Sequence, residues 1–219
     1  MPIKVKICGL TRTDDALAAV RAGADFAGLV FHPASPRHVS GDKARAIAEK
    51  LRGRVRVVAL FVDATDNAII DCVDTVRPDV LQLHGDEPPK RVAEIRARFG
   101  IPVMKAIGIS DRSDFDALPG YEAVADMLLF DAKTVAGLAG GRGCAFDWQL
   151  LRSRTIRKPW LLAGGLNVQN VARAIATAGA QGVDVSSGVE TSPGIKDAST
   201  IRDFVAAARA ANFPVEQPT

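Results

Sequence analysis

Two residues at the ends of apolar segments carry side chains that are suited to proton transfer. Cys8 ends the segment that begins near Ile3, and Asp131 ends the run that begins at Met127. A cysteine beside cationic groups can have a lowered pKa and act as a base or nucleophile, and a partly buried carboxyl group can act as a general acid. Cys8 could also be an inert small hydrophobe, and Asp131 could cap a turn. An isolated base and acid, without metal-ligand spacing, favour an isomerase over a hydrolase.

Two glycine- and serine-rich segments near the C-terminus predict an anion site. The apolar run at 161–163 is followed by Gly164 and Gly165, and the run at 182–185 is followed by Ser186 and Ser187. Either segment alone is more typical of a turn. Two consecutive strand-to-loop units of this kind match the phosphate site at the last two strands of many (β/α)8 barrels.

Arg37 is the strongest candidate for recognition of a second anionic group. It lies in the loop that begins at His32, directly between Pro36 and His38. A lone arginine is commonly a solvated surface charge, but a stiff loop favours presentation of its guanidinium fork to a carboxylate. His84 is a weaker candidate, and Asp86 could simply favour the start of a helix.

Eight apolar, β-branched segments recur along the chain at intervals typical of strand–helix units. They begin near Ile3, Phe26, Val55, Asp79, Pro102, Ala125, Pro159 and Gly182. The segments are continuously apolar, as expected for strands of a parallel sheet that is covered on both faces. We therefore predict an α/β fold, a single (β/α)8 (TIM) barrel over residues 1–211 with its phosphate site at strands 7 and 8, and a loose tail over 212–219.

Local signals place the helices between these strands. Ser40 and Asn167 are expected to begin helices, and Gly23, Gly100 and Gly179 to end them. The fifth helix, expected within 111–118, is weak. An open doubly wound sheet is the main rival fold, but it would require a nucleotide-binding fingerprint after the first strand, where Cys8-Gly9-Leu10-Thr11 stands.

Composition limits the possible partners. The 219 residues are 47% hydrophobic and carry a net charge of +3, with the basic residues scattered along the chain. This predicts no nucleic-acid role but is compatible with an anionic metabolite. Three widely spaced cysteines favour neither a disulfide framework nor a zinc site. The absence of a signal-like or membrane-spanning segment predicts a cytoplasmic protein.

As a set, these motifs resemble the phosphoribosylanthranilate isomerase family of tryptophan biosynthesis. The resemblance covers essentially the whole chain, in order and at barrel spacing. The matching segments are Lys6-Ile7-Cys8-Gly9-Leu10-Thr11, Ser35-Pro36-Arg37, Leu60-Phe61-Val62, Leu81-Gln82-Leu83-His84-Gly85, Asp131, Gly140-Gly141-Arg142-Gly143, Phe146-Asp147-Trp148, Ala163-Gly164-Gly165-Leu166, Asp184-Val185-Ser186-Ser187-Gly188-Val189-Glu190 and Ser192-Pro193-Gly194.

The resemblance implies an Amadori-type aldose–ketose isomerisation of N-(5-phosphoribosyl)anthranilate without cofactor or metal. Asp131 would be the general acid and Cys8 the base, and Arg37 would hold the anthranilate carboxylate. The expected contacts to the phosphorylated substrate are His84, Gly164, Gly165, Asp184, Ser186, Ser187 and Glu190. The chain is expected to be a monomer or homodimer with no nucleic-acid or membrane partner. Arg142 departs from the family, which usually carries a small hydroxyl residue there, and Cys144 follows.

Two other functions remain open from the sequence. The first is another phosphate-binding barrel of the same pathway, which closes an indole ring or cleaves indole glycerol phosphate. Such an enzyme would be expected to place paired carboxylates or a lysine at the strand ends, and Lys105 is the only candidate here. A barrel that binds a phosphorylated ligand and regulates a partner would have no need for both Cys8 and Asp131.

Overall fold

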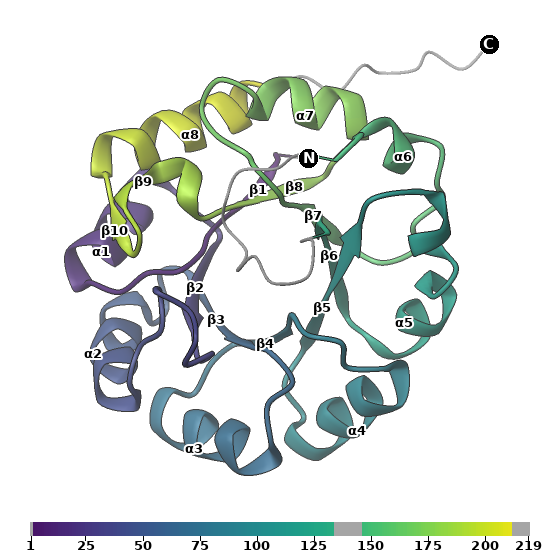
Figure 1. The fold of residues 1–219 in the computed structure, drawn as a ribbon. Helices are drawn as coiled ribbons and strands as arrows, with labels where there is room; N and C mark the ends of the chain where they lie inside the picture. Colours follow the sequence, from purple (N-terminus) through teal and green to yellow (C-terminus); the bar gives the residue numbers. More distant parts are fainter. Residues whose placement is uncertain (1, 134–145, 212–219) are drawn as a thin grey trace.

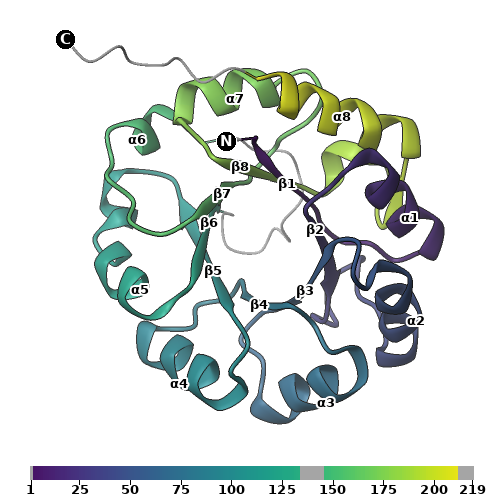
Figure 2. The ribbon, with the colours of Figure 1, turned by 180° about the vertical axis from the view of Figure 1, so that it is seen from behind.

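Eight parallel strands close into a ring that is surrounded by helices (Figure 1). The computed structural model describes residues 2–133 and 146–211. The strands follow one another around the ring, and β1 pairs with both β2 and β8 (Figure 2). Their bounds are β1 Lys4–Ile7, β2 Phe26–Val30, β3 Arg56–Phe61, β4 Val80–Leu83, β5 Val103–Ile109, β6 Met127–Ala132, β7 Trp160–Leu162 and β8 Gly182–Val185. The predicted (β/α)8 barrel is confirmed, and each strand begins within two residues of its predicted start.

A helix follows each strand. The helices are α1 Thr13–Ala22, α2 Gly41–Leu51, α3 Asp66–Val76, α4 Pro89–Phe99, α5 Leu118–Val124, α6 Gln149–Arg152, α7 Val171–Ala178 and α8 Ala198–Ala210. Short 3₁₀ helices, η1 Arg112–Phe115 and η2 Ser187–Val189, follow β5 and β8, and a small hairpin, β9 Glu190–Ser192 and β10 Ile195–Lys196, precedes α8. The predicted tail at 212–219 lies outside the described residues.

Most predicted helix ends are confirmed. Ser40 is the residue before α2, and Gly23, Gly100 and Gly179 follow α1, α4 and α7 in the left-handed conformation. The prediction for Asn167 was wrong, because α7 begins only at Val171. Asn167 instead closes a turn, in which its side-chain oxygen accepts from the backbone N–H groups of Gln169 at 2.9 Å and Asn170 at 3.1 Å.

The fifth helix was placed too early from the sequence. Residues 112–115 form only η1, whereas α5 starts at Leu118 and carries Pro119 in its first turn. A proline is tolerated there, since its missing N–H would have no partner within the helix. The Pro119-Gly120 pair therefore does not stop the helix, although it reads as a breaker in the sequence.

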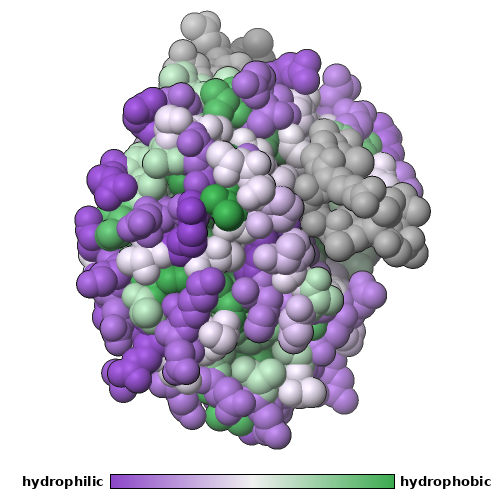
Figure 3. Space-filling model, turned by 60° about the vertical axis from the view of Figure 1, so that its left-hand side comes forward, coloured by the Kyte–Doolittle hydropathy of each residue, from purple (hydrophilic) through white to green (hydrophobic). Residues whose placement is uncertain are grey.

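The buried side chains form separate layers inside and outside the ring. Alternating strand positions point inward and build a small cluster: Phe26, Val58, Val80, Met104, Ala106, Leu129, Leu161 and Ala163. The larger cluster packs between strands and helices. The outer face is mostly hydrophilic in the view of Figure 3, and Ile195 is the one large hydrophobic side chain exposed in the described part of the chain. Within that part, no helix has the length and apolarity to cross a membrane.

A buried ion pair ties the loop after β4 to β5. Lys105 Nζ lies 2.9 Å from Glu87 Oε2 and donates to the Gly85 carbonyl at 2.6 Å. Glu87 also accepts from the backbone N–H groups of Asp63 and Gly85. Lys105 is therefore engaged in a structural contact, which argues against the lysine-dependent chemistry considered from the sequence.

Replacement of Lys105 should destabilise the fold strongly. Lys105→Met leaves the Glu87 carboxylate buried without its cation, which we expect to lower the free energy of unfolding by about 3 kcal/mol in urea titrations. The matched control is Arg45→Met, which breaks the exposed Arg45–Glu49 pair and should cost under about 1 kcal/mol. Equal losses in the two variants would contradict a structural role for Lys105.

Candidate active site

Cys8 lies at the C-terminal end of β1, on the inner side of the ring. Its backbone N–H donates to the Val185 carbonyl at the end of β8 at 2.8 Å, and its side chain packs beside Val30 and Leu60 in a small inner cluster. Gly28 of β2 leaves room for the thiol, because a methyl group there would lie 2.8 Å from Cys8 Sγ. Chemistry in this fold takes place at these strand ends.

A buried ion pair lies directly below the thiol. Lys6 Nζ contacts Asp184 Oδ1 at 2.9 Å, and the Lys6 side chain is fully buried. A methyl group on Gly28 would also lie 3.2 Å from Lys6 Nζ, which places this ammonium close to Cys8. Burial lowers the pKa of Lys6, but the charges of Asp184 and Cys8 more than offset it and raise the pKa overall. Asp184, expected as a substrate contact, is thus the partner of Lys6.

A lowered pKa for Cys8, one of the two possibilities considered from the sequence, does not fit its surroundings in the structure. Burial raises the pKa of the thiol above its ordinary value and outweighs the nearby charges. Lys6 and Lys196 pull in the opposite direction by favouring the thiolate, while Asp184 disfavours it. Cys8 is therefore a thiol at neutral pH, with cations beside it that oppose the cost of ionisation.

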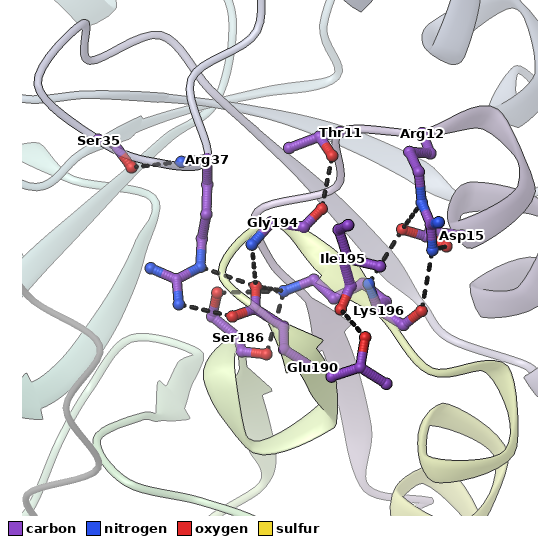
Figure 4. A network of polar contacts seen from close by, with 11 residues as sticks. Thr11, Arg12, Asp15, Ser35, Arg37, Ser186, Glu190, Gly194, Ile195 and Lys196 are labelled. Carbon is purple, nitrogen blue, oxygen red and sulfur yellow. Dashed lines mark hydrogen bonds and ion pairs between the residues drawn. The ribbon is translucent and has the colours of Figure 1, made fainter.

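Arg37 belongs to a buried network that joins the loop after β2 to the end of β8 (Figure 4). Its Nε and Nη2 donate to the two oxygens of Glu190 at 2.8 and 2.7 Å. Lys196 Nζ donates to Glu190 Oε1 at 2.7 Å and to the Ser186 carbonyl and hydroxyl at 3.0 and 3.2 Å. Lys6 and Lys196 could not be assigned a role from the sequence: Lys6 stands within the first apolar segment, and Lys196 follows a proline–glycine turn with no signal of its own.

Asp131 is the penultimate residue of β6, on the same rim, and is contacted from two sides. Its Oδ1 accepts from the backbone N–H of Ala132 at 2.8 Å, and its Oδ2 lies 3.3 Å from His84 Nε2. The other ring nitrogen of His84 contacts Gln82 Nε2 at 2.8 Å. Asp131 remains about one-third exposed, so its carboxyl group can reach a ligand in the barrel mouth.

The loops after β7 and β8 pack against each other. Gly164 and Gly165 follow β7, and η2 begins at Ser187. A methyl group on Gly188 would lie 1.9 Å from the Leu166 carbonyl, so only glycine permits this approach. On the other side, a methyl group on Gly164 would meet Asp131 Oδ1 at 3.0 Å. The predicted anion loops and the predicted acid are therefore neighbours.

Two further expectations concern the segment at 140–144 and metal binding. Gly140, Gly141, Arg142, Gly143 and Cys144 lie outside the described residues. Over residues 2–133 and 146–211, no group of three or more metal-ligating side chains is placed to bind an ion. The structure brings to one rim a thiol, a carboxyl group, a cationic network and the two loops predicted to bind an anion.

Fold and site together define a (β/α)8-barrel enzyme equipped for proton transfer on an anionic ligand. Residues 5–207 match the family model described as N-(5'-phosphoribosyl)anthranilate (PRA) isomerase. The chain is 54% identical over 212 residues to the N-(5'-phosphoribosyl)anthranilate isomerase of Rhodopseudomonas palustris strain BisA53, covering 96% of this chain and 97% of the relative.

Solved structures agree with this assignment. The phosphoribosyl anthranilate isomerase of Thermotoga maritima superposes with a TM-score of 0.85 at 40% identity, covering 94% of this chain and 98% of that one. A second isomerase structure, in complex with reduced 1-(o-carboxyphenylamino)-1-deoxyribulose 5-phosphate, has a TM-score of 0.81 at 38% identity and the same coverage. The chain belongs to the N-(5'-phosphoribosyl)anthranilate isomerase family and is an isomerase of tryptophan biosynthesis.

The raised pKa of Cys8 can be measured directly. Difference titration of the unmodified protein against Cys8→Ser, followed by the ultraviolet absorbance of the thiolate, should give a midpoint above that of an exposed cysteine thiol, because burial disfavours the charged form. The signals of Cys72 and Cys144 cancel in the difference. A Cys8 thiolate that is already formed at neutral pH would contradict the assigned direction.

Proposed function

We propose that Cys8 and Asp131 carry the two proton transfers of this isomerisation, with Arg37 and the loops after β7 and β8 holding the two ends of the substrate. The observation that supports the proposal is that a thiol and a carboxyl group lie on one rim, with a cationic network and the glycine- and serine-rich loops after β7 and β8 beside them. A substrate with anions at both ends is then stretched across the mouth, so that its reacting carbons lie between base and acid.

The reaction begins at the sugar ring. Asp131, in its protonated form, gives its proton to the ring oxygen of the ribose. The bond between C1 and this oxygen breaks, and the nitrogen lone pair completes a Schiff base at C1. His84, which contacts Asp131 Oδ2, orients the carboxyl group for this step and contacts the opened sugar.

Cys8 then acts on the opened chain. Its thiolate removes the proton from C2, the C2–H electron pair forms a double bond between C1 and C2, and the C=N electron pair moves to the Schiff-base nitrogen, which gives an enolamine. Tautomerisation returns a proton to C1 and leaves the ketone at C2. The raised pKa of Cys8 makes the thiolate scarce but strongly basic, which suits removal of a carbon-bound proton. Lys6 and Asp184 act through the thiol, from beneath it, without touching the substrate.

The phosphate is bound by the loops that contain Gly164, Gly165, Ser186 and Ser187. Lys196 donates to Ser186 Oγ, so the hydroxyl proton of Ser186 is free to be donated to a phosphate oxygen. Backbone N–H groups at the start of η2 add further donors. Binding energy from this remote group then supports the chemistry at C1 and C2.

We further propose that the enzyme works without cofactor in the cytoplasm, as a monomer or homodimer. A dimeric relative from Thermotoga maritima supports the second state. Sedimentation of the purified chain at several concentrations distinguishes the two.

Substitution of the acid and the base should abolish turnover in folded protein. We expect Cys8→Ser and Asp131→Asn each to lower kcat by at least about 10²-fold, since general acid and base catalysis supply about that much. The assay follows the fall in fluorescence of freshly made phosphoribosyl anthranilate. Cys72→Ala, in α3 and away from the rim, is the control. Near-native rates in both site variants would refute these roles.

Gly188→Ala should weaken binding at the phosphate end. The added methyl group forces η2 away from the Leu166 carbonyl, so KM for the substrate and the inhibition constant for inorganic phosphate should both rise by about tenfold or more. Gly41→Ala is the matched control, because its methyl group meets only ordinary contacts. An unchanged phosphate inhibition constant would place the phosphate elsewhere.

A further inference from the structure

The network around Arg37 holds one more cation than carboxylates can neutralise. Two cationic side chains, Arg37 and Lys196, share the single carboxylate of Glu190 (Figure 4). The three side chains are 10%, 0% and 5% exposed in the order Arg37, Lys196, Glu190. Burial of an unbalanced charge is unfavourable, so the triad is a site of excess positive charge that favours an anion.

Lys196 is fully committed to the protein and cannot itself bind the ligand. An ammonium group has three N–H donors, and its three acceptors here are Glu190 Oε1 and the carbonyl and hydroxyl oxygens of Ser186. Burial lowers the pKa of Lys196, while hydrogen bonding and charge from Glu190 oppose that effect. The three acceptors around Nζ match its three N–H donors.

Arg37, in contrast, has donors to spare. Nε and one N–H of Nη2 bind Glu190, so three of the five guanidinium donors are unused in the triad. The remaining guanidinium nitrogen points away from Glu190 in Figure 4. In a simple Arg37–Glu190 pair, the carboxylate would cancel the arginine charge. Lys196 shares the same carboxylate, so the charge of Glu190 is divided between two cations and Arg37 keeps part of its positive charge.

The hairpin that carries Lys196 is fixed to the loop after β1 and to the start of α1. The Lys196 backbone N–H donates to Asp15 at 3.1 Å, and its carbonyl accepts from Arg12 at 3.1 Å. Thr11 donates to the Gly194 carbonyl at 2.5 Å. The position of Lys196 is therefore set by the start of α1 and does not depend on a ligand.

We propose that Lys196 is a positioning residue that keeps Arg37 available for the substrate carboxylate by counter-charging Glu190, and that it links this grip to Ser186 in the phosphate loop. The proposal rests on the function assigned above and adds a residue to it. It predicts that the two members of the Lys196–Glu190 pair have opposite effects on substrate binding, because they change the local charge in opposite directions.

The test measures kcat and KM for phosphoribosyl anthranilate in three variants. Lys196→Met leaves Arg37 neutralised by Glu190 and should raise KM by about tenfold or more. Glu190→Gln keeps an acceptor for Arg37 and removes the negative charge, so KM should stay the same or fall. Lys196→Met combined with Glu190→Gln restores one net positive charge and should recover most of the lost affinity.

A purely structural role for the hairpin gives a different pattern. Both single variants would then raise KM, and the double variant would be at least as impaired as Lys196→Met, which would overturn the proposal. Lys43→Met, at an exposed position of α2, removes the same charge from the chain and should leave KM unchanged. Absence of turnover in the unmodified protein would instead refute the proposed function. If Lys196→Met does not fold, the KM of Glu190→Gln alone decides: an unchanged or lower KM supports the proposal, and a higher KM overturns it.

Discussion

The charge balance around Cys8 is the constraint on which the rest of the site depends. Lys6, Arg37 and Lys196 surround the thiol region, with Asp184 and Glu190 as their counter-ions. Such groups can be buried only when each is paired and hydrogen-bonded. The pairs therefore fix the relative positions of β1, β8, the loop after β2 and the hairpin β9–β10. The positive charge left over opposes the cost of forming a thiolate in buried surroundings and favours an anionic ligand.

Other parts of the site are held together by close packing at glycines rather than by charge pairs. Gly28 lets the thiol and Lys6 lie against β2, and Gly188 lets the β8 loop lie on the β7 loop. A rigid rim of this kind holds donors in place before a ligand arrives, so little reorganisation is needed during the reaction. The anion loops, the acid and the base are thereby parts of one packed layer rather than separate features.

The sequence predicted the barrel well because continuous apolar strands at regular spacing admit few other folds. Cys8, Asp131, Arg37 and the paired loops could be located because strand ends meet on one rim. Three further features could not be predicted from the sequence. The helix that starts at Leu118 was hidden by Pro119 and Gly120, which are tolerated in a first turn. The raised Cys8 pKa depends on burial, which spacing does not reveal. Lys6 and Lys196 look like solvated charges until their partners are placed, and the partner of Lys6 is 178 positions away.

The Lys6–Asp184 contact has a consequence for synthesis of the protein on the ribosome. Its two halves come from the first and the last strands of the barrel, so the ring stays open until β8 has been made. Contacts of such long range are formed late, since a long loop must first be closed. A nascent chain therefore carries Cys8 from the outset but acquires the Lys6–Asp184 pair beside it only after β8 has been made. Chains truncated before β8 would accordingly lack both the closed ring and the ion pair beneath the thiol.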